Sequence, residues 1–345
     1  MRRFEHKKEV INSLTEAQKI AFGPLTFQAI NAMLELGILK LIDSNPDCDL
    51  MSELNLSEYT INTLLEVAEA AGVIKYDDEK YSVTSLGKAF LYDEMTRVNF
   101  NFVKDVCYRG AEKLKESFFS GKPEGLKKYG FDGTIYPYIS ILPENMKKSW
   151  FEFDHYYSDN SFDIIYKIIS PVEKIFDIGA NTGKFERVCL KYNKNQKLVL
   201  IDLPQNIGVI KNNPELRGCE FYQADILKEE QNLPKMSGAV IMSQFLDCFS
   251  KSQIEFILQK VVQASDDNIK IYILEPFIDR QKFAGANFAL VHTSLYFTCM
   301  ANGCSKMYSF GEMEKIIEAS GLKINAVYDS LGAHDYTLLE CVKNA

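Results

Sequence analysis

The hydrophobic pattern changes near residue 170, where short apolar runs begin to alternate with amphipathic stretches. The apolar runs lie in "EKIFDIG", "QKLVLID", "CEFYQADI", "GAVIMSQ" and "NIKIYILEP". Between them, stretches such as "GKFERVCLKY" and "SQIEFILQKVVQA" repeat their apolar residues at helical spacing. This alternation predicts an α/β domain, a parallel sheet with helices on both faces.

The last part of the chain predicts a different connection. "FGEMEKIIEASG" is typical of a helix that stops at glycine. It is followed by "LKINAVYDS", a turn at Gly332 and "HDYTLLECVK". Two strands separated by so short a turn pair antiparallel, so we expect a hairpin at the edge of the sheet.

Helical spacing dominates the first hundred residues. "LTFQAINAMLELGILKLI" has apolar residues at helical spacing. "LSEYTINTLLEVAEAAGVI" has Ser57 as a candidate N-cap and stops at Gly72. "IKYDDEKYSVT" then indicates two short strands around an acidic turn. Helices followed by a two-stranded wing are the winged-helix pattern.

These patterns divide the chain into three regions. Residues 1–100 form the predicted winged-helix domain, and residues 161–345 form the predicted α/β domain. Between them, residues 101–160 are rich in aromatic side chains, and Pro137 and Pro143 break any single helix there.

Composition narrows the possible partners. The net charge of −8 disfavours a nucleic acid or an anionic membrane surface as a partner. The N-terminus has no apolar segment of a signal peptide, and no run of eighteen apolar residues occurs. The eight cysteines form no C-x-x-C pair, and there are only four histidines, so we expect neither a metal site nor disulfides. We therefore expect a cytoplasmic protein.

A winged helix often binds DNA, but the charge of this one argues against that role. Residues 1–100 carry ten lysines and arginines against sixteen aspartates and glutamates. The helix in the recognition position carries Glu58, Glu66 and Glu69, which would face phosphates with like charge. The apolar helices before it are instead expected to bury against a second copy of the chain.

The stretch "FDIGANTGKF" lies where the first parallel strand should meet its helix, and three types of ligand-binding loop are candidates for it. A phosphate-binding P-loop does not fit, because Gly179 and Gly183 are one residue too close and Phe185 follows the lysine. A dinucleotide loop does not fit either, because Asn181 replaces its middle glycine. The remaining pattern, D-x-G-x-x-x-G, is that of a loop for S-adenosylmethionine. A tight strand-to-helix turn with no ligand would also explain the two glycines.

Three acids strengthen the ligand interpretation. Asp177, Asp202 and Asp225 lie at the ends of three successive predicted strands. Asp177 would offer negative charge to the ammonium and sulfonium groups, Asp202 would accept both ribose hydroxyls, and Asp225 would accept the adenine amine. Ligands of such folds bind at the carboxyl edge of the sheet, where these strand ends meet.

In the order "FDIGANTGKF", "LIDLPQ", "QADI", "SQFLDCFSKSQ" and "LEP", the chain resembles the class I S-adenosylmethionine-dependent methyltransferases. "DLPQ" and "YSFGEMEKIIEASGL" are more narrowly similar to the O-methyltransferases that carry an N-terminal winged-helix dimerisation domain, as in the caffeate and hydroxyindole enzymes. The resemblance spans nearly the whole chain. It implies a homodimer, a seven-stranded sheet with a reversed last strand, and a substrate cleft roofed by residues 101–160.

The chain departs from that family where the family keeps its catalytic residues. The family motif "LHDW" holds the histidine that removes the phenol proton, and this chain has "LDCF" instead. Asp247 stands at the histidine position and Phe249 at the tryptophan position. Glu275 matches one of the two acids that orient the histidine, and Met307 replaces the other.

Asp247 therefore has two interpretations. A carboxylate with an ordinary pKa near 4 is a weak base for a phenol, but burial among Leu246, Cys248 and two phenylalanines would raise its pKa, and so would Glu275. Alternatively, Asp247 is a turn or N-cap carboxylate of the helix beginning near Lys251, although Ser250 is an equally good cap.

Other side chains are candidates for the acceptor site. His292 and Tyr296 are four residues apart in a predicted helix that lines the substrate pocket in the resembling family. His155 and Tyr157 lie in "FDHYYSDNS", where that family contacts substrate and donor. His292 can equally be a histidine of the core or the surface, and the aromatic side chains nearby often simply pack between domains.

Together these observations predict an enzyme that transfers a methyl group from S-adenosylmethionine to a hydroxyl group of a small aromatic or phenolic molecule. A non-catalytic S-adenosylmethionine or metabolite binder, and a methyltransferase acting on nitrogen or another acceptor, stay open as alternatives. The predicted catalytic residues are Asp247, Glu275 and His292. The predicted cofactor-binding residues are Asp177, Gly179, Asn181, Gly183, Asp202, Leu203, Asp225, Ile226, Ser243 and Phe249. The predicted substrate-binding residues are His155, Tyr157 and Tyr296, and no metal ligand is expected.

Overall fold

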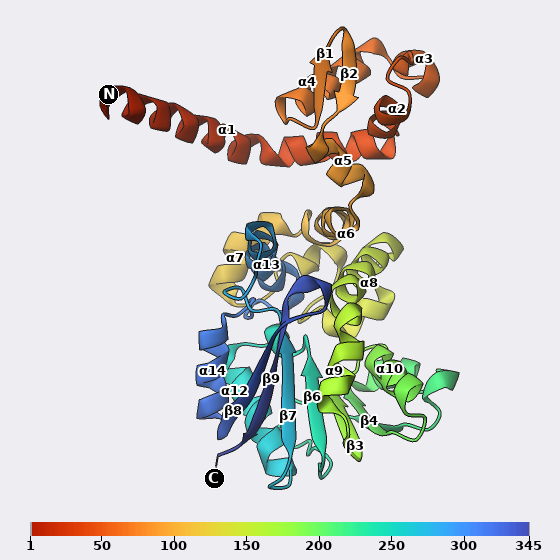
Figure 1. The fold of residues 1–345 in the computed structure, drawn as a ribbon, viewed down its shortest axis with the longest axis vertical. Coiled ribbons are helices and arrows are strands. Elements are labelled where there is room, and N and C mark those ends of the chain that lie inside the picture. Colours follow the sequence, from red (N-terminus) through yellow and green to blue (C-terminus); the bar gives the residue numbers. More distant parts are fainter. Residues whose placement is uncertain (1, 345) are drawn as a thin grey trace. The chain divides into compact units, whose positions relative to one another are not determined.

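The computed structural model describes residues 2–344, with side chains from residue 7 onward, and the chain divides into two compact units at Arg97 and Val98 (Figure 1). Among the described residues no single helix is long and apolar enough to cross a membrane. Two consecutive helical segments, Lys7–Glu35 and Ile38–Ser44, are long and apolar enough only when taken together, and they are bent by 62° at the break between them.

The N-terminal unit contains helices followed by a two-stranded antiparallel hairpin, as the pattern predicts. Gly37, with a φ of +77°, divides the apolar stretch of residues 25–42 between two helices. Ser57 is the N-cap of the fourth helix, because its Oγ accepts from the Thr60 amide at 3.2 Å. The elements are α1 (Arg2–Glu35), α2 (Ile38–Ser44), α3 (Leu50–Leu54), α4 (Glu58–Ala70), β1 (Ile74–Asp77), β2 (Lys80–Val83) and α5 (Ser85–Tyr92).

The C-terminal unit is built on a seven-stranded sheet with the order β5-β4-β3-β6-β7-β9-β8. The first five strands in this order are parallel, and β9 runs antiparallel to both β7 and β8, so the predicted reversed strand is confirmed. The strands are β3 (Lys174–Ile178), β4 (Lys197–Asp202), β5 (Glu220–Gln223), β6 (Ala239–Ser243), β7 (Lys270–Glu275), β8 (Leu322–Leu331) and β9 (Tyr336–Lys343).

Each face of the sheet buries its own apolar core, because successive side chains of a strand point to opposite faces. On β3, Phe176 and Ile178 pack in the core shared with α12 (Lys251–Ala264) and α14 (Phe310–Ala319). Ile175 packs in the other core. That second core is shared with α9 (Phe162–Ile169), α10 (Lys184–Tyr192) and α11 (Pro204–Ile210). Figure 1 shows α12 and α14 on one side of the sheet and α9 and α10 on the other.

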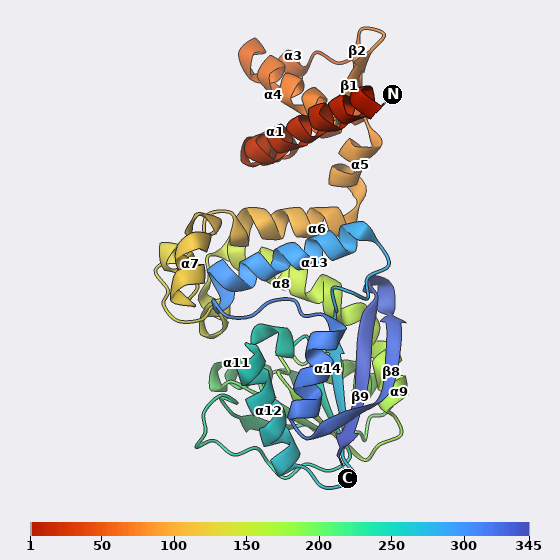
Figure 2. The same cartoon turned by 90° about the vertical axis from the view of Figure 1, so that its left-hand side faces the viewer.

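A third core joins the helices that precede the sheet to residues 284–301, the first helical segment after β7. α8 (Glu144–Ser158) begins directly after Pro143, and a 3₁₀ turn contains Pro137, so the two prolines interrupt the helical segment as predicted. Figure 2 shows α8 and α13 (Ala284–Tyr296) beyond one end of the strands. The remaining elements here are α6 (Glu94–Phe102), η1 (Val103–Cys107), η2 (Ala111–Lys113), α7 (Leu114–Ser120), η3 (Leu126–Tyr129), η4 (Tyr136–Ile141), η5 (Asp159–Ser161) and η8 (Phe297–Ala301).

Candidate active site

The glycine loop after β3 is a tight turn whose two glycines are required by packing. Gly179 has a φ of +86°, and a Cβ on it would lie 2.3 Å from the ring of Phe245. Gly183 has a φ of +71°, and a Cβ on it would lie 2.4 Å from a methyl group of Leu216. The positive φ values also favour glycine, so the turn itself accounts for both residues.

Asn181, at the centre of this loop, links two elements that are distant in sequence. Its φ is +48°, a left-handed conformation that asparagine tolerates. Its amide donates to Asp202 Oδ2 at 2.8 Å, and its side-chain Nδ2 donates to Asp154 Oδ2, also at 2.8 Å. Because of these two bonds, the loop is tied both to the end of β4 and to α8.

Asp202 ends β4 and organises the carboxyl edge of the sheet. Its Oδ1 accepts from the amide of Leu203 at 2.7 Å and from Nδ2 of Asn206 at 2.8 Å, at the beginning of α11. Burial raises the pKa of this carboxyl, and the hydrogen bonds from Asn206, Leu203 and Asn181 oppose that rise. The carboxylate remains half-buried.

Asp225 and Ile226 follow β5, the strand next to β4. Gln223 pairs with Asp202, so Asp225 lies two residues beyond the same sheet edge. Among the described residues its carboxylate accepts one long hydrogen bond, 3.3 Å, from the amide of Leu227, and the side chain is half-buried. Ile226 is buried in the core on the α12 side. The structure therefore brings two of the three predicted strand-end acids to one edge, beside the glycine loop.

The third acid, Asp177, lies inside the protein. It is 4% exposed and lies against the carboxyl group of Glu186, which is fully buried in the first turn of α10. No donor serves Asp177 Oδ1 or either Glu186 oxygen among the described residues. Burial raises the pKa of Asp177 to about 7, and burial together with Asp177 raises the pKa of Glu186 well above its ordinary value. We infer that the two carboxyl groups share a proton, which would give both of them a hydrogen bond.

This buried pair of carboxyl groups makes the free energy of unfolding depend on pH. In the unfolded chain both carboxyls lose their protons near pH 4, whereas in the folded chain Asp177 keeps its proton up to about pH 7 and the pKa of Glu186 is also raised well above its ordinary value. The folded state binds more protons in that window, so the free energy of unfolding falls as the pH rises through it. We expect Glu186→Gln, which removes the ionisable group, to raise the melting temperature at pH 8.5 by about 2–4 °C, the effect of about 1 kcal/mol.

Calorimetric melting of Glu186→Gln at pH 5.5 and 8.5 checks this expectation. Glu215→Gln is the matched control, because Glu215 is exposed and its partner is Arg187 at 3.4 Å. A gain for Glu186→Gln that is the same at both pH values would contradict the shared proton.

The turn after β6 is held by Glu275, which ends the neighbouring strand β7. Glu275 Oε1 accepts from the amides of Phe245 and Leu246 at 3.1 and 2.9 Å. Its Oε2 has no hydrogen-bond partner among the described residues, and the side chain is 2% exposed. Ser243 Oγ, at the end of β6, is likewise buried and unpartnered. The predicted Glu275 thus positions the loop that carries Asp247.

Asp247 lies in the 3₁₀ turn η7 (Leu246–Cys248) and is 6% exposed. Its Oδ1 accepts from the Cys248 thiol at 3.5 Å. Burial, and then the negative charge of Asp154, raise the pKa of Asp247 to about 7. Burial and Asp247 in turn raise the pKa of Glu275. Burial, the first expected cause of the raised Asp247 pKa, is confirmed. The negative charge that adds to it is that of Asp154, which the sequence did not single out, rather than that of the predicted Glu275.

The N-cap interpretation of Asp247 is wrong. Ser250 caps α12, with its Oγ accepting from the Gln253 amide at 3.4 Å and its own amide donating to Gln253 Oε1 at 2.9 Å. This reciprocal capping box leaves Asp247 outside the helix.

The cap assignment predicts a clear difference between two variants. Ser250→Ala is expected to cost about 1 kcal/mol and to lower the melting temperature by about 2–4 °C. Asp247→Asn should leave the melting temperature unchanged or raise it, because it removes a buried acid and no cap. Thermal denaturation followed by circular dichroism measures both, and equal losses would contradict the assignment.

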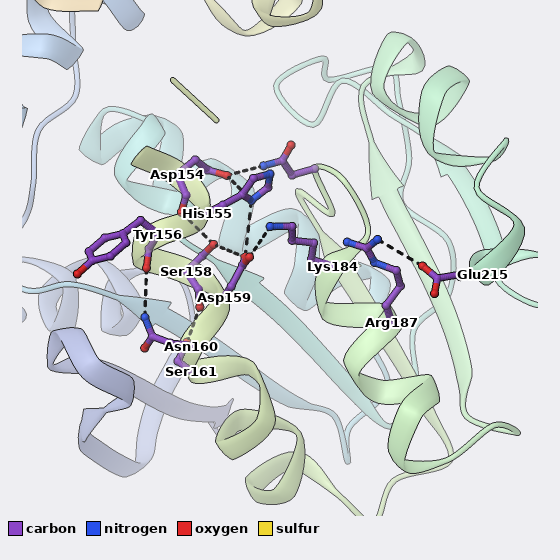
Figure 3. A network of polar contacts seen from close by, with 11 residues as sticks. Asp154, His155, Tyr156, Ser158, Asp159, Asn160, Ser161, Lys184, Arg187 and Glu215 are labelled. Carbon is purple, nitrogen blue, oxygen red and sulfur yellow. Dashed lines mark hydrogen bonds and ion pairs between the residues drawn. The ribbon is translucent and has the colours of Figure 1, made fainter. Parts of the chain in front are cut away.

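His155 lies in a polar network at the end of α8 that Figure 3 shows. Its Nδ1 is 3.6 Å from both Asp154 Oδ2 and Asp159 Oδ1. Lys184, directly after the glycine loop, forms an ion pair with Asp159. His155 is therefore placed between two carboxylates that contact the loop.

The other predicted acceptor-site residues have different surroundings. The Tyr157 hydroxyl donates to Asn99 Oδ1 at 2.7 Å. Tyr296 is buried, and its hydroxyl accepts from Trp150 Nε1 at 2.7 Å. His292 is exposed, with its ring stacked on Phe288 at 3.9 Å and its Nδ1 2.7 Å from the Phe288 carbonyl. The structure therefore does not bring His292 into the buried cluster that contains Tyr296.

Sequence reasoning missed Asp154, which joins the glycine loop to α8. Burial, opposed chiefly by His155, raises the pKa of Asp154 to about 6. Asn302 was also missed. Its Nδ2 donates to the carbonyl of Cys248 at 2.9 Å and contacts the Tyr136 hydroxyl at 3.1 Å. The stretch "FDHYYSDNS" was the one sequence feature that pointed to α8 as part of the site. No sequence feature pointed to Asn302.

Comparison with known proteins agrees with this arrangement. Residues 114–323 match the O-methyltransferase domain, and residues 15–81 match the Dimerisation2-like domain. An L-tyrosine C(3)-methyltransferase from Streptomyces lavendulae is 21% identical over 315 residues, 88% of this chain and 85% of that protein.

Solved structures share the fold over nearly the whole chain. The mitomycin 7-O-methyltransferase has a TM-score of 0.74 at 16% identity, covering 98% of this chain and all of that one. Human N-acetylserotonin methyltransferase, solved with S-adenosylmethionine, has a TM-score of 0.66 at 14% identity, covering 96% of this chain and 98% of its own.

Proposed function

We propose, from the premise that this chain belongs to the O-methyltransferase family, that it transfers a methyl group from S-adenosylmethionine to a hydroxyl group of a small aromatic molecule. S-adenosylhomocysteine is the second product. The observation that carries the proposal is a buried carboxyl, Asp247, in the turn after β6, at the same carboxyl edge of the parallel strands as Asp202 and Asp225.

The residues at this edge suit S-adenosylmethionine. Asp202 and Asp225 retain acceptor capacity for the ribose hydroxyls and the adenine amine, next to Leu203 and Ile226. The buried Ser243 Oγ has no hydrogen-bond partner in the part of the chain that the structure describes, and a bound ligand can supply one. Gly179, Asn181 and Gly183 form the loop, Asp177 lies beneath it, and Phe249 packs against Phe245 at 4.9 Å. When bound, the cofactor supplies an electrophilic methyl group on a sulfonium.

Asp247 then accepts the proton of the attacking hydroxyl. Burial supports this role, because it brings the carboxyl pKa to about 7, much nearer to that of a phenol. Glu275 is a positioning residue, because its hydrogen bonds to the Phe245 and Leu246 amides fix the turn that carries Asp247. Methyl transfer also requires that the acceptor hydroxyl is aligned with the methyl group of the cofactor.

Aromatic side chains support an aromatic acceptor. Trp150 and Tyr296 are hydrogen-bonded to each other, and Phe102 stacks on Phe153 at 4.0 Å beside Tyr296. Flat ring faces of this kind suit a flat ligand. His155, Tyr157 and Tyr296 stay as candidate substrate contacts, and His292 stays as an alternative proton acceptor.

The N-terminal domain, residues 1–100 in our division, is proposed to form a homodimer. The match to a Dimerisation2-like domain supports this role, as do the exposed apolar side chains of α1, which need a covering partner. The exposed residues are Val10, Ile11, Leu14, Ile20, Phe22 and Leu25. All eight cysteines are free, which suits the reducing cytoplasm, where we place the protein.

Two measurements test the function. Titration calorimetry should detect binding of S-adenosylhomocysteine, and no binding would reject the proposal. Labelled S-adenosylmethionine with a panel of phenols, catechols and arylamines should give labelled product. Binding without product on any acceptor would favour the alternative of a non-catalytic binder. That alternative arises because Asp247 replaces the family histidine and Met307 replaces one of its acids. Product only on arylamines would favour nitrogen as the acceptor.

A further inference from the structure

One side-chain hydrogen bond joins the glycine loop to α8, the helix that carries candidate acceptor contacts. Asn181 Nδ2 donates to Asp154 Oδ2 at 2.8 Å, across 27 residues of sequence. The backbone amide of the same Asn181 donates to Asp202 Oδ2, also at 2.8 Å. A single residue therefore contacts both the carboxylate proposed for the ribose hydroxyls and a carboxylate of α8.

The backbone at Asn181 suits glycine, but a glycine has no side chain to make this contact. The φ of +48° lies in the left-handed region, which glycine adopts freely and asparagine tolerates. The bond to Asp202 comes from the backbone amide, so any residue other than proline would supply it. What the asparagine side chain adds to the loop is its hydrogen bond to α8.

A second link between the loop and this region is looser. Lys184, three residues further along, forms an ion pair with Asp159 in η5, directly after α8 (Figure 3). Both side chains are partly exposed, and exposed ion pairs contribute little. A lysine also has a flexible four-carbon stem, whereas the short side chain of Asn181 fixes the distance between loop and helix. Asn181 is therefore the tighter of the two links.

α8 carries aromatic side chains next to Asp154. Trp150 lies one helical turn before Asp154, and its Nε1 donates to the Tyr296 hydroxyl at 2.7 Å. Phe153 stacks on Phe102 at 4.0 Å, and Phe102 in turn contacts Tyr296 edge-on. These are the side chains that support an aromatic acceptor, so whatever holds Asp154 in place also holds them.

We propose that Asn181 and Asp154 are positioning residues that transmit occupancy of the cofactor site to α8, so that bound S-adenosylmethionine fixes the helix that lines the acceptor site. The cofactor orders the glycine loop, the loop orders Asn181, and Asn181 holds Asp154. Without the cofactor, the loop and α8 open locally more often. Because such coupling is reciprocal, each ligand raises the affinity for the other. This inference rests on the proposed function and concerns the regulation of the same site.

Hydrogen exchange of the full-length protein tests the coupling with S-adenosylhomocysteine as the only ligand. At saturation, the backbone amides of α8 should exchange about 5-fold or more slowly than in the free protein, the lower end of ordinary coupling between sites. Asn181→Gly removes the bond to Asp154 and keeps the backbone amide that serves Asp202. It should reduce the slowing to less than about 2-fold.

The chain supplies its own second reporter, because Trp150 is its single tryptophan and lies on α8. Saturation with S-adenosylhomocysteine should change the fluorescence emission of Trp150 in the wild type and not in Asn181→Gly.

Three further variants separate the hydrogen bond from a general loss of structure. Asp154→Asn keeps a side-chain oxygen that accepts from Asn181 and should keep the slowing of exchange, whereas Asp154→Ala should lose it. Asn206→Ala is the matched control, because it removes a hydrogen bond to the other oxygen of Asp202, from α11 rather than from the loop. It should keep the slowing as well.

Equal slowing in the wild type and in Asn181→Gly overturns the inference, because the cofactor then acts on α8 by another route. Equal losses in Asn181→Gly and Asn206→Ala overturn it too, and so does bound S-adenosylhomocysteine that leaves the exchange of wild-type α8 unchanged. Failure of the protein to bind S-adenosylhomocysteine in calorimetry is a different result, since it rejects the proposed function itself.

Discussion

Replacing Asp247 by asparagine is expected to lower kcat by about 10²- to 10⁴-fold, the usual contribution of a general base. The affinity for S-adenosylhomocysteine should stay within about 3-fold, because Asp247 lies outside the proposed cofactor contacts. Asparagine keeps the shape of the side chain but accepts no proton. Steady-state kinetics with the best acceptor from the panel, together with calorimetry, measures both quantities.

The pH profile adds a second readout for the same residue. A base works only when it is deprotonated, and the pKa of Asp247 is raised to about 7. For the wild type, kcat/KM should therefore be low below pH 6, rise through about pH 7 and level off above pH 8. The Asp247→Asn profile should lose this rise. A rise that persists in the variant would assign it to another group.

Two further variants serve as controls for Asp247. Cys248→Ala removes the thiol that donates to its carboxylate and should change kcat by less than about 10-fold, because the base itself remains. His292→Ala separates the two candidate bases, and it should have a small effect because His292 is exposed and bonded to its own helix. If His292→Ala abolishes activity and Asp247→Asn does not, Asp247 is not the base.

Replacing Asp202 by alanine is expected to weaken S-adenosylhomocysteine binding by about 10²-fold. The two ribose hydroxyls would lose a charged acceptor. Each hydrogen bond to a charged group contributes about 1.5–3 kcal/mol to the binding free energy. The same change also removes the acceptor of the Asn181 and Leu203 amides, so the melting temperature should fall by several degrees. Calorimetry and thermal denaturation report the two effects separately.

Asn206→Ala isolates the structural part of this effect. It removes one of the hydrogen bonds to Asp202 and keeps the carboxylate. We expect a small loss of stability and less than about 5-fold weaker S-adenosylhomocysteine binding. If the two variants weaken binding equally, Asp202 acts only by ordering the start of α11, and its role as a ribose contact is rejected.

Local sequence was sufficient to predict the elements, because their signals do not depend on distant residues. The alternation of apolar runs and helical stretches predicted the sheet, since strands buried on both faces read as continuous apolar runs. Ser57 and Gly72 marked the beginning and end of α4 through backbone requirements that act within a few residues. The order of the strand-end acids likewise followed from the rule that parallel strands end at one edge.

The sequence by itself thus determined the sheet, the glycine turn, and the positions of Asp202, Asp225 and Asp247 along the chain. Only the tertiary structure decided which carboxyls are buried together. It sets Asp177 against Glu186, and it makes Asp154, 93 residues away in sequence, a neighbour of Asp247. It also leaves His292 exposed while Tyr296 is buried. The physical reason is that burial and electrostatic coupling depend on distances between elements, and local periodicity carries no information about those distances.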